Sequence, residues 1–173
     1  MNAGFHIPAA VAVLSTLMVV TRTNAVHALL YLVVSLLSVA VIFLVAGAPF
    51  VAALEVIIYA GAIMVLFVFV IMMLNLGPQS MRQERALLDP SAWAGPAALS
   101  AALMIELLVV LIRGAGPATG RLEIGPKQVG LALFGPYVLA VELASMLLLA
   151  GIVGAYHLGR RRDSDMDAGE RKR

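Results

Sequence analysis

Three glutamates lie inside long apolar runs of this sequence, and a carboxylate there is the side chain best able to do chemistry. They are Glu55, Glu106 and Glu142. A charged side chain at the centre of a bilayer costs about 2.5–3.5 kcal/mol on insertion scales, so intramembrane acids usually have a function. Proton relay or electrostatic coupling is one interpretation. The structural alternative is that each glutamate is protonated, or pairs with a Ser, Thr, Arg or backbone group of a neighbouring helix.

A tyrosine and a cluster of small residues follow the first glutamate in the stretch ALEVIIYAGAIMVLFVFVIMMLN. Tyr59 comes four residues after Glu55, so both side chains share one face of an α-helix. The tyrosine is either a hydrogen-bond partner for the carboxylate or water, or an interior aromatic anchor. Gly61, between two alanines, permits close approach of another helix. It would also suit a helix that changes its hydrogen-bond register, because π-bulges occur at functional sites.

Other chemistry finds little support in the sequence. Cysteine is absent, which excludes disulfides, thiolate zinc sites and conventional iron–sulfur ligation within this chain. The three histidines, His6, His27 and His157, are far apart, and no zinc-protease, Walker or dinucleotide motif occurs. There is no basic stripe with interleaved aromatic residues, so nucleic acid is not an expected partner. We therefore expect no metal, nucleotide or other cofactor in this chain.

The composition places these residues in a membrane. Hydrophobic residues make up 62% of the 173 residues and charged residues 13%, against roughly 45–50% and about 25% in soluble domains. The apolar runs are continuous and each approaches the roughly 20 residues that cross a bilayer as a helix. We predict an all-α integral membrane protein with five transmembrane helices, at about 3–20, 25–46, 50–74, 92–112 and 136–157. Residues 1–159 form the membrane domain and 160–173 a charged cytoplasmic tail.

Local signals support these boundaries. Asn24 is a candidate N-cap for the second helix. Pro49 stands where a third helix would begin, directly after a turn. The first apolar run lacks a basic segment before it and a clear cleavage site after it, so we interpret it as a retained span.

Basic residues predict the orientation. With the N-terminus outside, nine basic residues face the cytoplasm and three face the other side. The nine are Arg22, Arg82, Arg85, Arg160, Arg161, Arg162, Arg171, Lys172 and Arg173, and the three are Arg113, Arg121 and Lys127. We therefore predict the N-terminus out and the C-terminus in.

The glutamates should lie at similar depth. At 1.5 Å per residue, Glu55 is about 8 Å from the start of its span, and Glu106 and Glu142 are about 9 Å from the nearer end of theirs. With five spans these ends face the same side of the membrane. A fifth helix that began near Val129 and kinked at Pro136 would instead move Glu142 towards the middle.

Three stretches resemble a known family. They are TNAVHALLYLVVSLLS (23–38), ALEVIIYAGAIMVLFVFVIMMLNLG (53–77) and LFGPYVLAVELASMLLLAG (133–151). They are similar to subunit J of the bacterial proton-pumping NADH:quinone oxidoreductase, whose mitochondrial counterpart is subunit six of respiratory complex I. The resemblance covers residues 1 to about 160. The loop at 77–91, the fourth span and the charged tail are its divergent parts.

The resemblance implies a membrane-arm subunit of the cell inner membrane without a redox centre. Its partners would be the A, H, K and N types of subunit, with FMN, iron–sulfur clusters and quinone held by other subunits. The family's third helix carries a π-bulge at positions matching Tyr59 to Val65, including Gly61, thought to gate a hydrated path. Glu55 and Tyr59 match the acid and tyrosine of that helix, and Glu142 the acid of the fifth. Glu106 matches no family acid, which favours the structural alternative there.

Two other classes of function stay open. One is a purely structural or assembly subunit, although an inert scaffold has no need of buried acids. The other is an equivalent subunit in a related cation/proton antiporter or membrane hydrogenase complex. A self-sufficient transporter is disfavoured because neither inverted repeats nor paired broken helices are evident.

Overall fold

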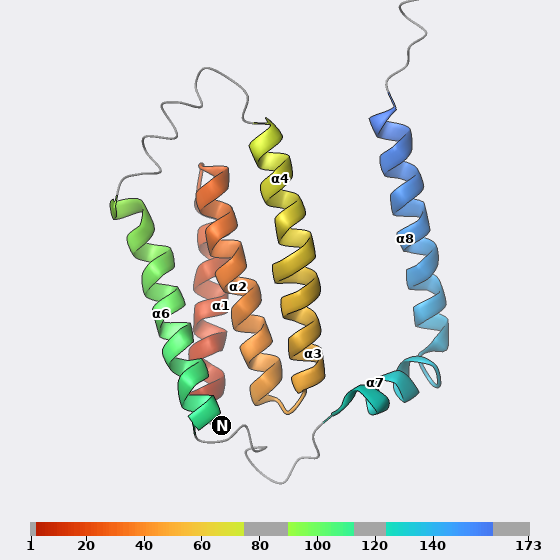
Figure 1. Ribbon diagram of the computed structural model, residues 1–173, viewed down its shortest axis with the longest axis horizontal. Helices are drawn as coiled ribbons and strands as arrows, with labels where there is room; N and C mark the ends of the chain where they lie inside the picture. The colour runs from red at the N-terminus through yellow and green to blue at the C-terminus, as the bar shows by residue number, and fades with distance from the viewer. Residues whose placement is uncertain (1–2, 75–89, 113–123, 161–173) are drawn as a thin grey trace, which may run out of the picture. The chain divides into compact units, whose positions relative to one another are not determined.

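The computed structural model describes residues 3–74, 90–112 and 124–160. All secondary structure in these ranges is helical (Figure 1). In chain order the elements are α1 (Ala3–Thr21), α2 (Ala25–Val45), α3 (Pro49–Leu54), the π-helix η1 (Glu55–Ile63), α4 (Met64–Leu74), α6 (Pro90–Ile112), α7 (Pro126–Leu133) and α8 (Val138–Gly159).

Five helical segments are long and apolar enough to cross a membrane, as predicted. They are Gly4–Thr21, Ala25–Val45, Pro49–Leu74, Trp93–Ile112 and Val138–Gly159. The third is continuous through α3, η1 and α4. The direction in which these helices cross the membrane remains a prediction.

The helix starts have the local causes that the residue types indicated. The side-chain oxygen of Asn24 accepts hydrogen bonds from the backbone N–H groups of Val26 at 2.9 Å and His27 at 3.4 Å, which caps α2. Gly47 turns the chain between α2 and α3 with φ of 85°, a conformation that glycine adopts at no steric cost. Pro49 occupies the first turn of α3, where its missing N–H is not needed.

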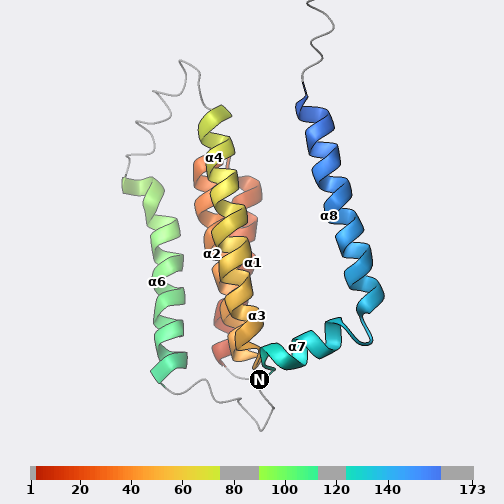
Figure 2. The same ribbon diagram turned by 45° about the vertical axis from the view of Figure 1, so that its right-hand side comes forward.

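The chain divides into two compact units, Met1–Gly125 and Pro126–Arg173. In the first, α1 and α2 form an antiparallel hairpin, and α6 contacts both of them (Figures 1 and 2). The Thr16 and Ser35 hydroxyls are hydrogen-bonded at 2.8 Å across the hairpin. The buried residues of α2 are Leu29, Tyr31, Val34, Ser35, Ser38, Ala40 and Val41, so α2 is the central helix of this unit.

The second unit consists of α7 and α8 with a turn between them. Pro136 lies in that turn, which the Tyr137 N–H closes by bonding the Ala132 carbonyl at 3.1 Å. The fifth span thus begins at Val138 rather than at residue 136. The alternative of a kinked helix from Val129 is wrong, because the helix is broken at the proline rather than bent. Glu142 lies four residues after the start of α8, about 6 Å along its axis.

Several predicted features lie outside the described residues. These are most of the loops at 77–91 and 113–128, and the tail at 160–173 except Arg160. Most of the basic residues used to predict the orientation belong to these segments.

Candidate functional site

The third span contains an unusual element, the nine-residue π-helix η1. Backbone hydrogen bonds in a π-helix run from residue i to residue i+5, and such segments mostly last a single turn and often mark functional sites. The Met64 N–H still bonds the Tyr59 carbonyl, five residues back. The segment implied by the resemblance, Tyr59 to Val65, overlaps η1 but differs at both ends. The π-helix begins earlier, at Glu55, and Val65 lies beyond it in α4.

The π register changes the relation between Glu55 and Tyr59. Their four-residue spacing suits α-helical hydrogen bonding, whereas in η1 the residue one hydrogen-bonded turn after Glu55 is Ala60. Among the described residues no hydrogen bond joins the Glu55 carboxylate to the Tyr59 hydroxyl. Glu55 is half-buried, and the Tyr59 side chain is 48% exposed. Both groups are therefore open to partners or water from outside the described part of the chain.

Gly61 occupies a position where the π register leaves little room. A Cβ atom built on Gly61 would lie 3.2 Å from the Val56 carbonyl oxygen, five residues back. Few real Cβ atoms come so close to another atom, so a larger residue would push against the hydrogen-bonded turn that defines η1. The absence of a Cβ on Gly61 thus removes a close contact within the π-helical turn.

Buried residues flank η1, whereas none lies within it. Ala52, before it, and Met64, directly after it, are buried, and Met64 is only 2% exposed. Both α3 and η1 contact α2, beside which they lie in Figures 1 and 2. The flanks are therefore fixed by packing, while the nine residues between them are not enclosed. Sequence reasoning missed Met64 because the stretch 63–74, to which it belongs, is apolar on every face of the helix.

The other two glutamates lie on separate elements, Glu106 on α6 and Glu142 on α8. Glu106, on α6, is 8% exposed, and its Oε1 atom would be 3.3 Å from a Cβ added to Gly4 of α1. It lies between α1 and α6, which supports a structural role for it. Glu142 is exposed on α8, in the second unit, where the Ser145 hydroxyl donates to its backbone carbonyl at 2.7 Å.

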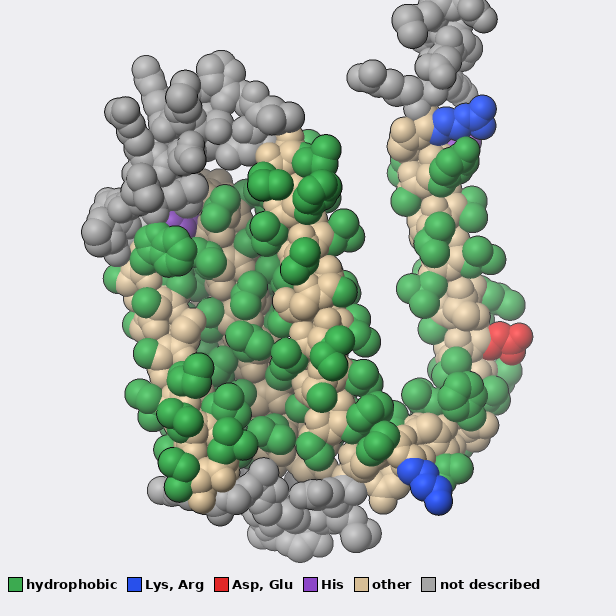
Figure 3. All heavy atoms as spheres, viewed as in Figure 1, with side chains coloured by type: hydrophobic (Ala, Val, Ile, Leu, Met, Phe, Trp, Pro, Cys, Tyr) green, Lys and Arg blue, Asp and Glu red, His purple; other side chains and the backbone are tan. Residues whose placement is uncertain are grey.

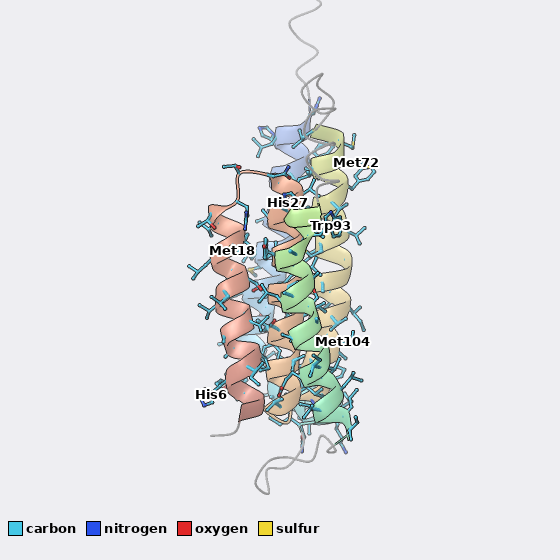
Figure 4. All side chains as sticks on the ribbon, turned by 90° about the vertical axis from the view of Figure 1, so that its left-hand side faces the viewer. His6, Met18, His27, Met72, Trp93 and Met104 are labelled. Carbon is cyan, nitrogen blue, oxygen red and sulfur yellow. The ribbon has the colours of Figure 1, made fainter. Side chains whose placement is uncertain are left out.

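The surroundings of several polar groups inside the first unit were not predicted from the sequence. Tyr31 is 3% exposed, and its hydroxyl packs against Gly95 of α6. The Arg22 guanidinium lies 5.6 Å from the centre of the Tyr31 ring, within the range of a cation–π interaction. The Nε2 atom of His27, near the start of α2 (Figure 4), is buried without a hydrogen-bond partner among the described residues. No spacing rule in the sequence connects such positions on separate helices.

The described residues offer no evident metal site. No group of three or more His, Cys, Asp and Glu residues in those ranges is placed to hold a metal ion. What η1 presents instead is one carboxylate, one phenol and a backbone whose hydrogen-bond register differs from that of the helices on either side.

Comparison with known proteins identifies the family. The family described as NADH-ubiquinone/plastoquinone oxidoreductase chain 6 matches residues 15–158. A Pseudomonas aeruginosa protein named NADH-quinone oxidoreductase subunit J is 59% identical over 162 residues, which cover 93% of this chain and 98% of the relative. Its Escherichia coli namesake is 54% identical, covering 92% and 87%. The Rhodobacter capsulatus namesake is 36% identical, covering 94% and 83%. The chain belongs to this family, as a subunit J of the NADH-quinone oxidoreductase without a catalytic centre indicated in its own residues.

Proposed function

We propose that this subunit helps to couple quinone reduction to proton translocation by gating a hydrated path at η1. The observation that carries the proposal is the nine-residue π-helix held between buried Ala52 and Met64. The π register would correspond to one state of the path, either open or closed. A return to α-helical hydrogen bonding would produce the other state. Because packed elements switch between discrete arrangements, a local change of register is suited to such a role.

Glu55, Tyr59 and Gly61 have separate parts in this mechanism. Glu55 and Tyr59 order water or protons beside η1, since both side chains are accessible and polar in an otherwise apolar span. Gly61 keeps the π register accessible because it has no Cβ to meet the Val56 carbonyl. Val65 is the second residue of the α-helix that follows, and would move when the register changes. Glu142, on the fifth span, is a further acidic group of the proposed proton path.

We also propose a membrane orientation and partner subunits for this chain. The subunit would span the bacterial inner membrane with its N-terminus outside and its C-terminus in the cytoplasm. It would pack against the A, H, K and N types of membrane-arm subunit. FMN, iron–sulfur clusters and quinone would be held by other subunits, and this chain would contribute only the switch.

The test is Gly61→Val in the intact complex, with Ala62→Val as the matched control. Ala62 is the exposed next residue, so its added methyl groups point away from the packed side. Overpacking costs about 1–3 kcal/mol, and a free-energy change of that size moves a two-state population roughly 5–150-fold. We expect Gly61→Val to assemble but to pump fewer protons per NADH oxidised, with Ala62→Val close to wild type.

Cryo-electron microscopy of the Gly61→Val complex provides the structural readout. We expect α-helical hydrogen bonding through residues 55–63 of that variant. Full proton pumping by an assembled Gly61→Val complex would refute the gating proposal and leave a purely structural subunit as the better account.

A further inference from the structure

Pro8 interrupts the backbone hydrogen bonding inside α1. In an α-helix the N–H of residue 8 would bond the carbonyl of residue 4, but proline has no N–H, so the Gly4 carbonyl lacks its helical donor. The ring of Pro8 lies on the same side as that carbonyl and is less than 2% exposed, so neighbouring helices cover this side of α1. In a membrane helix, a group from a neighbouring helix can bond the carbonyl that a proline frees.

Glu106 of α6 brings a carboxyl group to this part of α1. Its Oε1 atom would be 3.3 Å from a Cβ atom added to Gly4, and its side chain is 8% exposed. On the face of the first unit that Figure 3 shows, hydrophobic side chains cover the described residues and no acidic side chain is visible among them. The helix α6 therefore places a buried acid beside the residue whose carbonyl Pro8 leaves without a donor.

The surroundings of Glu106 suit a neutral acid better than a carboxylate. Among the described residues, no N–H group donates a hydrogen bond to its carboxyl group and no cation pairs with it. His6 is exposed on the side of α1 away from α6 (Figure 4), and His27 and Tyr31 lie near the start of α2, towards the other end of α6. Arg113 lies outside the described residues. A buried carboxylate without a partner is costly, whereas protonated glutamic acid offers one O–H donor.

We propose that Glu106 carries a proton in the assembled subunit and that its O–H donates a hydrogen bond to the Gly4 carbonyl. The acid thereby replaces the donor that Pro8 lacks, and the bond joins α6 to the first turns of α1. Because the proton is held in this bond, Glu106 is a positioning residue and is separate from the acids of the proposed proton path. The bond does not depend on the gating role of η1.

A double-mutant cycle with Pro8→Ala tests the proposal, because alanine restores the N–H that the Gly4 carbonyl lacks. The readout is the midpoint for loss of assembled subunit when the complex is heated in native membranes. Glu106→Leu has no donor and should lower the midpoint by about 4 °C, as one unsatisfied buried carbonyl would in a chain of this size. In the Pro8→Ala background the same substitution should lower it by less than about 1 °C. Glu106→Gln should keep the wild-type midpoint, because its amide N–H can also donate.

The matched control is Pro96→Ala, because Pro96 is also a buried proline inside a helix but lies ten residues before Glu106 on α6. In that background Glu106→Leu should cost as much as in the wild type. If Glu106→Leu alone does not assemble, assembly of the Pro8→Ala/Glu106→Leu pair supports the proposal and its failure overturns it. An equal cost of Glu106→Leu with Pro8 and with alanine at that position would overturn the proposal. Equal losses for Glu106→Gln and Glu106→Leu would overturn it too, because they would indicate an ionised carboxylate.

Discussion

The contact between Tyr31 and Gly95 allows a sharp test of the packing in the first unit. A methyl group added to Gly95 would overlap the Tyr31 hydroxyl oxygen and lie 3.2 Å from the ring carbon that bears it. Tyr31 has little space to move, since it is 3% exposed and its ring faces the Arg22 guanidinium. Gly95→Ala should therefore force Tyr31 out of its position or separate α2 from α6.

The loss of stability caused by Gly95→Ala follows from the kind of clash. Overpacking a close-packed interior typically costs about 1–3 kcal/mol, and we expect about 2 kcal/mol here because the overlapping atom is a single hydroxyl oxygen. The second substitution Tyr31→Phe removes that oxygen, and the nearest ring carbon, 3.2 Å from the added methyl group, then has to shift by only a few tenths of an ångström. The Gly95→Ala/Tyr31→Phe pair should thus recover more than half of the loss. Such non-additivity is the signature of a direct contact.

Heating the complex in native membranes and quantifying assembled subunit on native gels provides the assay. A loss of 2 kcal/mol corresponds to about 4–8 °C in the midpoint for a chain of this size. Gly151→Ala on α8 is the control, because an added Cβ there has no atom within 4 Å among the described residues. Equal midpoints for Gly95→Ala and wild type, or additive effects in the pair, would refute the reasoning.

Two further predictions concern the charge in the third span and the cap of α2. Glu55→Gln keeps the size of the side chain but cannot exchange a proton, so we expect an altered pH profile of proton pumping. The control is Glu106→Gln, whose pH profile should match the wild type. A wild-type profile for Glu55→Gln would leave Glu55 as a hydrogen-bonding group only. Asn24→Ala removes the acceptor for two backbone N–H groups at the start of α2 and should cost about 1 kcal/mol of stability. The same heating assay measures this loss. Asn24→Ser should retain most of the wild-type stability. Equal loss in the alanine and serine variants would argue against capping.

The sequence was sufficient to predict those parts of the fold that depend on local chemistry. Five apolar runs predict five membrane-length helices because a lipid-exposed backbone must satisfy its own hydrogen bonds. Asn24 and Pro49 act where their residue types indicate, at helix starts. The proline-containing stretch before the fifth span was ambiguous, since a proline can either kink a helix or end it. In the structure Pro136 lies in a turn, and α8 begins two residues later.

The candidate site was predictable only in part. Glu55 and Tyr59 stand out because polar groups are rare in such a span. The bounds of η1 were not predictable from hydrophobic periodicity, because a run that is apolar on every face carries no signal about its hydrogen-bond register. Contacts such as Tyr31 with Gly95, or Glu106 with Gly4, join residues from separate helices and depend on tertiary packing. The resemblance to subunit J supplied the expectation of a π-bulge, and the structure moved its start to Glu55.

The unequal burial of the helices has a consequence for how the chain matures during synthesis. The α1–α2 hairpin is made first, is closed by the short Arg22–Asn24 connection, and has an interhelical hydrogen bond between Thr16 and Ser35. It can become a stable pair while the ribosome is still adding the later helices. By contrast, α8 is made last and has no buried residue. The α1–α2 hairpin can thus serve as an early scaffold, whereas the last helix is synthesised only after this pair has formed.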